Sequence, residues 1–248
     1  MNTAIAIIPA RYASSRFPGK ALALLGGKPV IQHVYERVLA SGIFSTVAVA
    51  TDDERIASAV CAFGGQCIMT DAALASGTDR IAAALQEFRC SEDSIIFNVQ
   101  GDEPLISTEP LAALLAAFDD PEVEMASLMS RMDAADEPGN PNQVKVVVDK
   151  SYYALYFSRS IIPYDRDGGQ DYGYMRHIGV YAYRQAILQR FVSLPPSKLE
   201  TMEKLEQLRA LENGIRIKMV ATDYQGIGID TPEDLANMET LMQGEPGL

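Results

Sequence analysis

The sequence is poor in residues that bind transition metals or form disulfide bonds. It contains three cysteines and two histidines in 248 residues. Cys61, Cys67 and Cys90 lack the CxxC spacing of a zinc site, which argues against structural or catalytic zinc. An odd number of scattered cysteines is typical of free thiols in a reducing compartment, and so predicts a cytoplasmic protein.

Positive charge is also scarce, with 21 Lys and Arg against 33 Asp and Glu and a formal net charge of -12. This balance argues against nucleic acid or an anionic membrane surface as a partner, because both select basic proteins. The sequence has no basic segment followed by a long apolar run. We therefore expect neither a signal peptide nor a membrane-spanning helix.

Strand and helix patterns alternate through the first half of the sequence. We predict strands at 4–8, 46–50, 66–69 and 94–98, and helices at 29–40, 53–63, 78–88 and 107–118. Thr78 is the expected N-cap of the third helix. This alternation predicts an α/β fold with a mainly parallel sheet covered by helices.

The pattern changes after residue 124, where strand-like segments follow one another with few helices between them. We predict strands at 125–130, 144–148, 153–157, 177–183 and 216–220, and loops at 133–142 and 165–173. We expect helices at 184–192 and 199–213, and a last helix with Thr231 as N-cap and Pro232 at its first position. The segment 125–194 is therefore predicted to be a smaller, antiparallel lobe.

The loop after the first strand concentrates positive charge on an acidic protein. Residues 11–20 carry Arg11, Arg16 and Lys20 among small and turn-forming residues, with Ala10 directly before them. Open α/β sheets bind ligands at the carboxyl ends of their strands, so this basic loop indicates a polyphosphate site. Neither GxxxxGK[ST] nor GxGxxG is present, so cationic side chains must do much of the binding.

Two acidic segments complement this loop. Asp102 follows the strand that ends at Asn98, and it belongs to the same predicted sheet edge as the basic loop. Asp230 lies directly before the last helix, where an acidic residue is favoured by the helix dipole in any case. If the fold brings the two together, they can hold Mg²⁺ between the protein and a polyphosphate.

Ordered segments along the sequence resemble one known family, the 3-deoxy-manno-octulosonate (Kdo) cytidylyltransferases, also called CMP-Kdo synthetases. The segments are IIPARYASSRFPGK, VATDDERI, ASGTDRIA, NVQGDEPLI, YALYFSR, RHIGVYAY, EKLEQLRALENG and GIDTPEDL. They cover the chain from Ile7 to about Leu235. The basic loop alone would indicate only the wider class of nucleotidyltransferases.

The resemblance implies a fold and an activity. The fold would be a Rossmann-like nucleotidyltransferase domain over 1–248, with a nucleotide-binding core at about 1–124 and 195–248. The lobe at 125–194 would then serve sugar binding and dimerisation. The activity would be transfer of CMP from CTP to Kdo with Mg²⁺, with release of pyrophosphate, for lipopolysaccharide synthesis by a cytoplasmic homodimer.

The resemblance also implies roles for individual residues. Arg11, Lys20, Asp102 and Asp230 would be catalytic, and the two aspartates would bind the metal. CTP would contact Ala10, Arg11, Arg16, Lys20, Ser76, Gly77, Thr78, Arg80 and Gln100. The sugar acid would contact Arg159, His177, Tyr181, Glu206 and Gln207, with Arg159 suited to a carboxylate because its planar fork pairs two oxygens.

Two alternatives stay open at this point. The sequence departs from the family pattern near the sugar side, for example at Tyr164, Thr201 and Lys204. The acceptor is therefore either Kdo or 8-amino-Kdo. A nucleotide-binding protein without turnover is the second alternative, and the four intact catalytic candidates count against it.

Overall fold

The computed structural model describes residues 3–13, 16–133, 136–167 and 173–244. Parts of three predicted loops, at 14–15, 134–135 and 168–172, lie outside these described residues. The chain divides into two compact units, here called the first unit (residues 1–111 and 226–248) and the second unit (residues 112–225). Among the described residues, no helix has both the length and the apolar character needed to cross a membrane.

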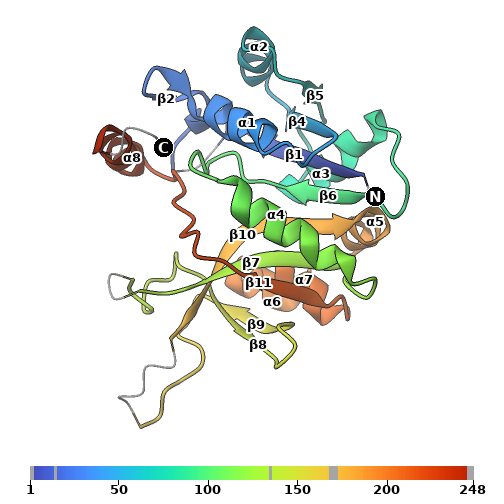
Figure 1. Cartoon of the computed structure of the whole chain (residues 1–248), viewed down its shortest axis with the longest axis vertical. Helices are drawn as coiled ribbons and strands as arrows, with labels where there is room; N and C mark the ends of the chain where they lie inside the picture. Colours follow the sequence, from blue (N-terminus) through green and yellow to red (C-terminus); the bar gives the residue numbers. More distant parts are fainter. Residues whose placement is uncertain (1–2, 14–15, 134–135, 168–172, 245–248) are drawn as a thin grey trace. The chain divides into compact units, whose positions relative to one another are not determined.

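The first unit contains a parallel sheet, as the alternating pattern predicts (Figure 1). The strand order is β5 (Cys67–Met69), β4 (Thr46–Thr51), β1 (Ala4–Ala10) and β6 (Ile95–Asn98). Five residues at the start of β1, Ala4 to Ile8, are buried without the alternation of a half-exposed strand. This is why a continuous apolar run could be recognised as a strand in the interior of a parallel sheet.

The helices of this unit agree with the predicted positions except at one cap. They are α1 (Val30–Ala40), α2 (Glu54–Ala62), α3 (Gly77–Ala84), α8 (Pro232–Gly244) and α4 (Thr108–Ala116), which spans the change between units. The prediction of Thr78 as a cap is wrong. Ser76 caps α3 instead, and its side chain accepts from Asp79 N at 3.0 Å in a reciprocal capping box.

Short elements complete the first unit. Single 3-10 turns cover Lys20–Leu22 and Leu85–Glu87, and β2 (Leu24–Leu25) pairs with β3 (Lys28–Pro29) in a small hairpin that was not predicted. Leu25 of this hairpin is buried with Val30, Ile229 and Met238. The apolar cluster therefore fixes the segment before α8 against the hairpin that follows the basic loop.

The second unit contains a mixed sheet. Its middle strand, β7 (Met125–Arg131), pairs in parallel with β11 (Ile217–Ala221) and antiparallel with β10 (Met175–Arg184). Strand β10 also pairs with β8 (Lys145–Val148), which pairs with β9 (Ala154–Ser158), both antiparallel. The predicted antiparallel character of this region is confirmed.

The helices of the second unit are shorter than predicted at one place. After a 3-10 turn at Ala117–Asp119, they are α5 (Gln185–Ser193), α6 (Lys198–Glu203) and α7 (Gln207–Glu212). The prediction of one helix over 199–213 is wrong, because Lys204 has the left-handed backbone angle φ 55° and ends α6. A side chain with a Cβ rarely adopts this conformation, so the sequence carries no ordinary break signal here.

The predicted lobe at 125–194 lies within the second unit, which also includes 112–124 and 195–225. The grouping of residues 195–225 with the nucleotide-binding core, and the role of the lobe in dimerisation, stay predictions.

Candidate active site

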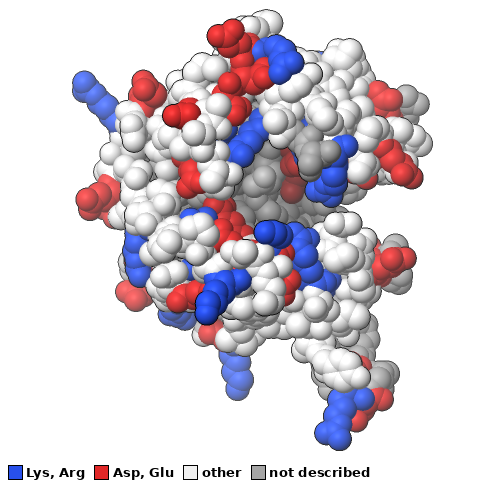
Figure 2. All heavy atoms as spheres, turned by 180° about the vertical axis from the view of Figure 1, so that it is seen from behind, with Lys and Arg blue, Asp and Glu red and all other residues white. Residues whose placement is uncertain are grey.

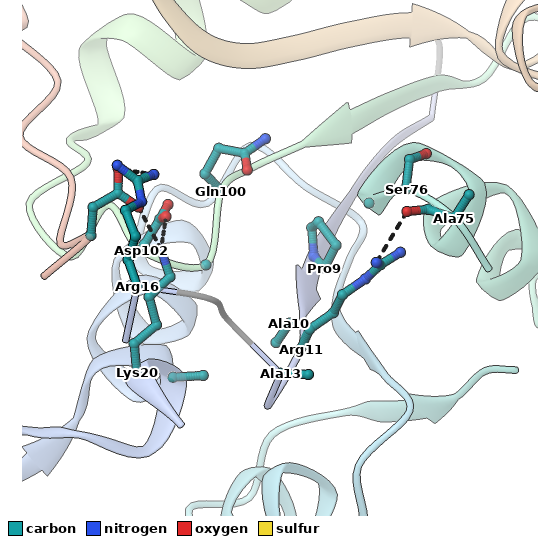
Figure 3. A pocket seen from close by; sticks show the side chains of 14 residues that line it. Pro9, Ala10, Arg11, Ala13, Arg16, Lys20, Ala75, Ser76, Gln100 and Asp102 are labelled. Atoms are coloured by element: carbon teal, nitrogen blue, oxygen red, sulfur yellow. Dashed lines mark hydrogen bonds and ion pairs between the residues drawn. The ribbon is translucent and has the colours of Figure 1, made fainter. Parts of the chain in front are cut away.

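A cleft of about 430 Å³ lies in the first unit, at the carboxyl ends of its parallel strands (Figure 3). Its walls come from the basic loop, the start of α3, the segment after β6 and the segment before α8. The lining residues are Pro9, Ala10, Arg11, Ala13, Arg16, Lys20, Ala21, Ala75, Ser76, Gly77, Gln100, Gly101, Asp102 and Asp230. The structure therefore brings together residues that are more than two hundred positions apart in sequence.

Charged side chains form a cluster on one wall of this cleft. The ammonium of Lys20 contacts a carboxylate oxygen of Asp102 and lies 3.0 Å from Asp230 Oδ1. The second oxygen of Asp230 accepts from the Arg16 guanidinium at 2.9 Å. Burial disfavours the Lys20 ammonium, but the two carboxylates outweigh this effect and raise the pKa of Lys20.

The two aspartates are held together through the backbone as well as through Lys20. The N–H of Ile229 donates to the carbonyl of Asp102 at 2.9 Å, and Ile229 is buried in the apolar cluster described above. The N–H groups of Asp230 and Thr231 both donate to Asp234 Oδ2, at 2.9 and 2.8 Å. The start of α8 therefore fixes Asp230 next to the segment that carries Asp102.

Two glycines allow these segments to approach. Gly19 has φ 74°, its N–H donates to Tyr12 O at 2.8 Å, and a Cβ there would lie 3.0 Å from the Tyr12 ring. A Cβ at Gly101 would lie 3.1 Å from the carbonyl of Pro9. Glycine at these positions closes the basic loop and lets the Asp102 segment lie against the end of β1.

The opposite wall is built around Arg11. Its guanidinium donates to the carbonyls of Ala75 and Leu74, at 3.1 and 2.7 Å, which fixes it beside Ser76 and the first residue of α3 (Figure 3). Gln100 lies between the Arg11 side and the Asp102 side in the same view. A helix start with backbone N–H groups and a nearby guanidinium suits an anionic or polar ligand.

Not every predicted CTP-binding residue reaches the cleft. Thr78 and Arg80 are buried and do not line it, whereas the other seven predicted residues do. Arg80 is fully buried and donates to Asp52 Oδ2 at 3.0 Å and to the hydroxyl of Thr70. It thereby joins α3 to the segments that follow β4 and β5. Asp52 was not predicted, although its place in VATDDERI, directly after a strand, was a usable signal.

The second unit gathers the predicted sugar-binding residues. Strand β10 has a bulge between Ile178 and Tyr181, where Ser127 Oγ bonds the carbonyls of Ile178 and Val180 and lies 2.9 Å from His177 Nε2. Bulges of this kind redirect side chains and are common near active sites. The His177 ring lies 5.0 Å from Phe157 and 5.3 Å from Tyr181 between ring centres.

Burial controls the ionisation of these rings. Burial lowers the pKa of His177 to about 3, so its imidazole is neutral near neutral pH. The pKa of Tyr181 is raised well above its usual value by burial, with further contributions from Tyr183 and Glu206. Both residues can therefore position a ligand by hydrogen bonds from their neutral forms. Gln207 follows Glu206 as the first residue of α7 and is also buried.

Backbone carbonyls within the protein already occupy much of the Arg159 guanidinium. Its guanidinium donates to the carbonyls of Glu203 at 2.7 Å, Pro141 at 2.7 Å and Lys204 at 3.3 Å. Three of its five N–H groups are therefore used, and at most two remain for a ligand. Glu203, which also accepts from Ser158 Oγ and Arg159 N, was missed by the sequence analysis because it resembles a solvated helix position.

The residues of the cleft fit a divalent cation that is shared with phosphate. Asp102 and Asp230 already share one cation, the Lys20 ammonium, and both offer hard oxygen ligands. The described residues contain no group of three or more His, Cys, Asp or Glu side chains that could hold a metal ion on its own. Mg²⁺ commonly takes one or two carboxylates together with phosphate oxygens, so two aspartates are sufficient.

On the face of the molecule drawn in Figure 2, basic and acidic side chains are interspersed rather than separated by sign. This face therefore shows no broad basic surface of the kind that nucleic acids require.

The cleft and the fold define a class of protein. The sequence pattern of the Cytidylyltransferase family matches residues 5–217, so the chain is a member of the cytidylyltransferases. The structure of a 4-diphosphocytidyl-2C-methyl-D-erythritol synthase from Anaerococcus prevotii is 14% identical with a TM-score of 0.60 and covers 98% of this chain, which shows the shared fold alone.

Closer relatives narrow the class. The chain is 50% identical to a 3-deoxy-manno-octulosonate cytidylyltransferase of Syntrophus aciditrophicus, with 98% of this chain and 99% of the relative covered. It is 53% identical to one of Thermodesulfovibrio yellowstonii, with 96% and 97% covered. The chain belongs to the family of 3-deoxy-manno-octulosonate cytidylyltransferases, the CMP-Kdo synthetases. The family predicted from the sequence is confirmed.

Two further comparisons bear on the ligands. A structure of CMP:2-keto-3-deoxy-manno-octonic acid synthetase, solved in complex with CTP, is 45% identical with a TM-score of 0.92 and covers 98% of this chain. This match confirms the predicted nucleotidyltransferase fold. An 8-amino-3,8-dideoxy-manno-octulosonate cytidylyltransferase of Shewanella oneidensis is 49% identical, with 96% of this chain covered.

The ion pair between the fully buried Arg80 and the partly exposed Asp52 should stabilise the fold. Asp52→Ala leaves the Arg80 guanidinium buried without its carboxylate, and we expect it to lower the free energy of unfolding by about 3 kcal/mol. Urea unfolding measures the change. The control is Glu36→Gln, which removes an exposed ion pair with Lys28 and should cost below about 1 kcal/mol. Equal losses in the two variants would contradict the structural role of Arg80.

The lowered pKa of the partly buried His177 should make stability depend on pH. Its pKa is lowered in the folded state, so only the unfolded state takes up its proton as the pH falls from about 6.5 towards 3. The wild-type protein should therefore lose about 1 to 2 kcal/mol of unfolding free energy from this residue between pH 7 and pH 5. Unfolding curves of His177→Gln should lack this loss, and those of His33→Gln should keep it. A loss of the same size in both variants would contradict the assignment.

Proposed function

We propose that the protein transfers CMP from CTP to the anomeric hydroxyl of Kdo and releases pyrophosphate. The observation that carries this proposal is the cleft that brings three cations, Arg11, Arg16 and Lys20, together with two carboxylates, Asp102 and Asp230. The full-length similarity to 3-deoxy-manno-octulosonate cytidylyltransferases supports the choice of substrates. The reaction activates the sugar for lipopolysaccharide synthesis.

The cations of the cleft bind the triphosphate in this proposal. Arg11, Arg16 and Lys20 lie around one cavity, so their charges can act on the α-phosphate and on the leaving pyrophosphate together. Attack of a sugar hydroxyl on the α-phosphorus spreads negative charge over the phosphate oxygens. Positioned cations stabilise that charge, and the enzyme needs no covalent nucleophile.

Asp102 and Asp230 would hold Mg²⁺. When bound, the metal neutralises phosphate charge and favours ionisation of the attacking hydroxyl. The protein contributes the two carboxylates, kept close together by the bond from Ile229 N to Asp102 O.

The remaining cleft residues would bind the nucleoside. Ala10, Ser76, Gly77 and Gln100 line the cavity directly. Thr78 and Arg80 would act from behind this wall, because Arg80 joins α3 to the segments after β4 and β5.

The sugar acid would be bound by residues of the second unit. His177 and Tyr181 are placed by the bulge of β10, and Glu206 and Gln207 lie at the start of α7. Arg159 would bind the sugar carboxylate with the N–H groups that do not already donate to the three carbonyls.

We infer further that the enzyme acts as a cytoplasmic homodimer. Three free cysteines among the described residues are compatible with a reducing compartment.

8-Amino-Kdo is the second candidate acceptor. The chain is 50% and 53% identical to two Kdo cytidylyltransferases and 49% identical to an 8-amino-3,8-dideoxy-manno-octulosonate cytidylyltransferase, which is a small difference. Glu203 and Glu206 bring carboxylates to the predicted sugar site, and a carboxylate that faced the amine would favour the amino sugar.

An assay of pyrophosphate release distinguishes the two acceptors. It supplies CTP and Mg²⁺ with Kdo or 8-amino-Kdo separately, and then with both sugars in competition. Release with neither sugar, while CTP still binds, would favour a nucleotide-binding protein without turnover.

Asp102 is the residue whose loss should affect turnover most specifically. Asp102→Asn keeps the shape of the side chain but removes its charge, so we expect kcat to fall about 100-fold or more at saturating Mg²⁺. The melting temperature should remain close to that of the wild type. Pyrophosphate release and circular dichroism measure the two effects.

The matched control is Glu92→Gln, which removes one negative charge at an exposed position of the same unit. It should retain wild-type turnover. Substantial activity of Asp102→Asn at saturating Mg²⁺ would remove Asp102 from the metal site.

A further inference from the structure

We propose that Lys20 is an internal competitor of the divalent metal, so that the metal site becomes available only when a triphosphate draws the ammonium away. This inference rests on the proposed function, because it concerns the same two carboxylates. The inference also sets the order of binding. The nucleotide binds first and displaces Lys20 from the carboxylates, and the metal binds only weakly when no nucleotide is present.

The first argument is the position of the ammonium. Lys20 Nζ contacts an oxygen of Asp102 and an oxygen of Asp230, and it is the same two carboxylates that would have to ligate a metal. A metal ion and an ammonium cannot both occupy the space between these oxygens. Binding of the metal therefore requires that Lys20 leaves.

The second argument is the charge balance. Lys20 and Arg16 supply two positive charges, Asp102 and Asp230 supply two negative charges, and the four groups are linked by ion pairs. A divalent cation gains little net attraction from a neutral cluster. A triphosphate brings several negative charges, pairs with Lys20 and Arg16, and leaves the carboxylates free to attract the metal.

The third argument is that the Lys20 side chain is flexible enough to move. The Lys20 ammonium is a compact charge on a flexible four-carbon stem, whereas Asp230 is fixed by the start of α8. Lys20 also lines the cleft itself, so its ammonium can move from the carboxylates to a ligand within the same cavity. Only the side chain has to change conformation.

Mn²⁺ is a suitable probe, because it can be measured directly and the described residues contain no separate cluster of three metal-ligating side chains. The experiment compares Mn²⁺ binding by the full-length wild type and Lys20→Met in the absence of nucleotide, by calorimetry and by the signal of free Mn²⁺. The control is Lys28→Met, which removes the same charge from an exposed pair with Glu36. The double variant Lys20→Met, Asp102→Asn tests whether the ion binds at the proposed site.

We expect Lys20→Met to bind one Mn²⁺ with a Kd about tenfold lower than the wild type, a coupling of ordinary size between two ligands of one site. Lys28→Met should match the wild type, and the double variant should lose the gain. Mn²⁺ should also raise the melting temperature of Lys20→Met more than that of the wild type, because binding to the folded state stabilises it.

Equal or weaker binding by Lys20→Met, with a melting curve that shows a folded protein, would overturn the proposal. A gain that persists in the double variant would overturn it too, because the ion would then bind elsewhere. Neither readout needs turnover. Failure to transfer CMP to either sugar would thus refute the proposed function and leave this result intact.

Discussion

The contact of one ammonium with two carboxylates is the interaction on which the active site depends. Lys20 comes from the basic loop, Asp102 from the segment after β6 and Asp230 from the start of α8. Without a cation between them, two carboxylates at this distance would repel each other. In this structure the Lys20 ammonium supplies the positive charge that the two carboxylates require, and in the proposed reaction a divalent metal would supply it while Lys20 pairs with phosphate.

Backbone constraints make this arrangement possible. Gly19 and Gly101 permit close approaches that a Cβ would obstruct, and the bond from Ile229 N to Asp102 O joins the two acidic segments. The buried Arg80 supports the opposite wall through its bond to the partly exposed Asp52. The site therefore consists of a few charged groups on a frame of buried contacts. Residues that do not line the cleft, such as Ile229 and Asp52, therefore help to place those that do.

Much of this was readable from the sequence. The apolar run before Pro9 and the alternation of elements predict the parallel sheet, and that sheet places the basic loop and Asp102 at one edge. The proximity of Asp230 could not be derived, because spacing along the chain does not show which distant loops meet. The left-handed Lys204 and the bulge of β10 were missed, since local patterns give no sign of a break that tertiary contacts impose. Arg80 was expected to contact CTP because its motif matches the family; in the structure its side chain is buried and bonded to Asp52, and a contact with CTP stays a prediction.

The central claim is that Asp102 and Asp230 jointly hold the metal while Lys20 binds phosphate. A crystal structure with Mn²⁺ and an unreactive CTP analogue tests it most directly, because anomalous scattering locates the metal. The account predicts an Mn²⁺ ion bonded to an oxygen of each aspartate, with the Lys20 ammonium at hydrogen-bond distance from a phosphate oxygen. An Mn²⁺ ion that touches only phosphate, with Lys20 still between the two carboxylates, would contradict it.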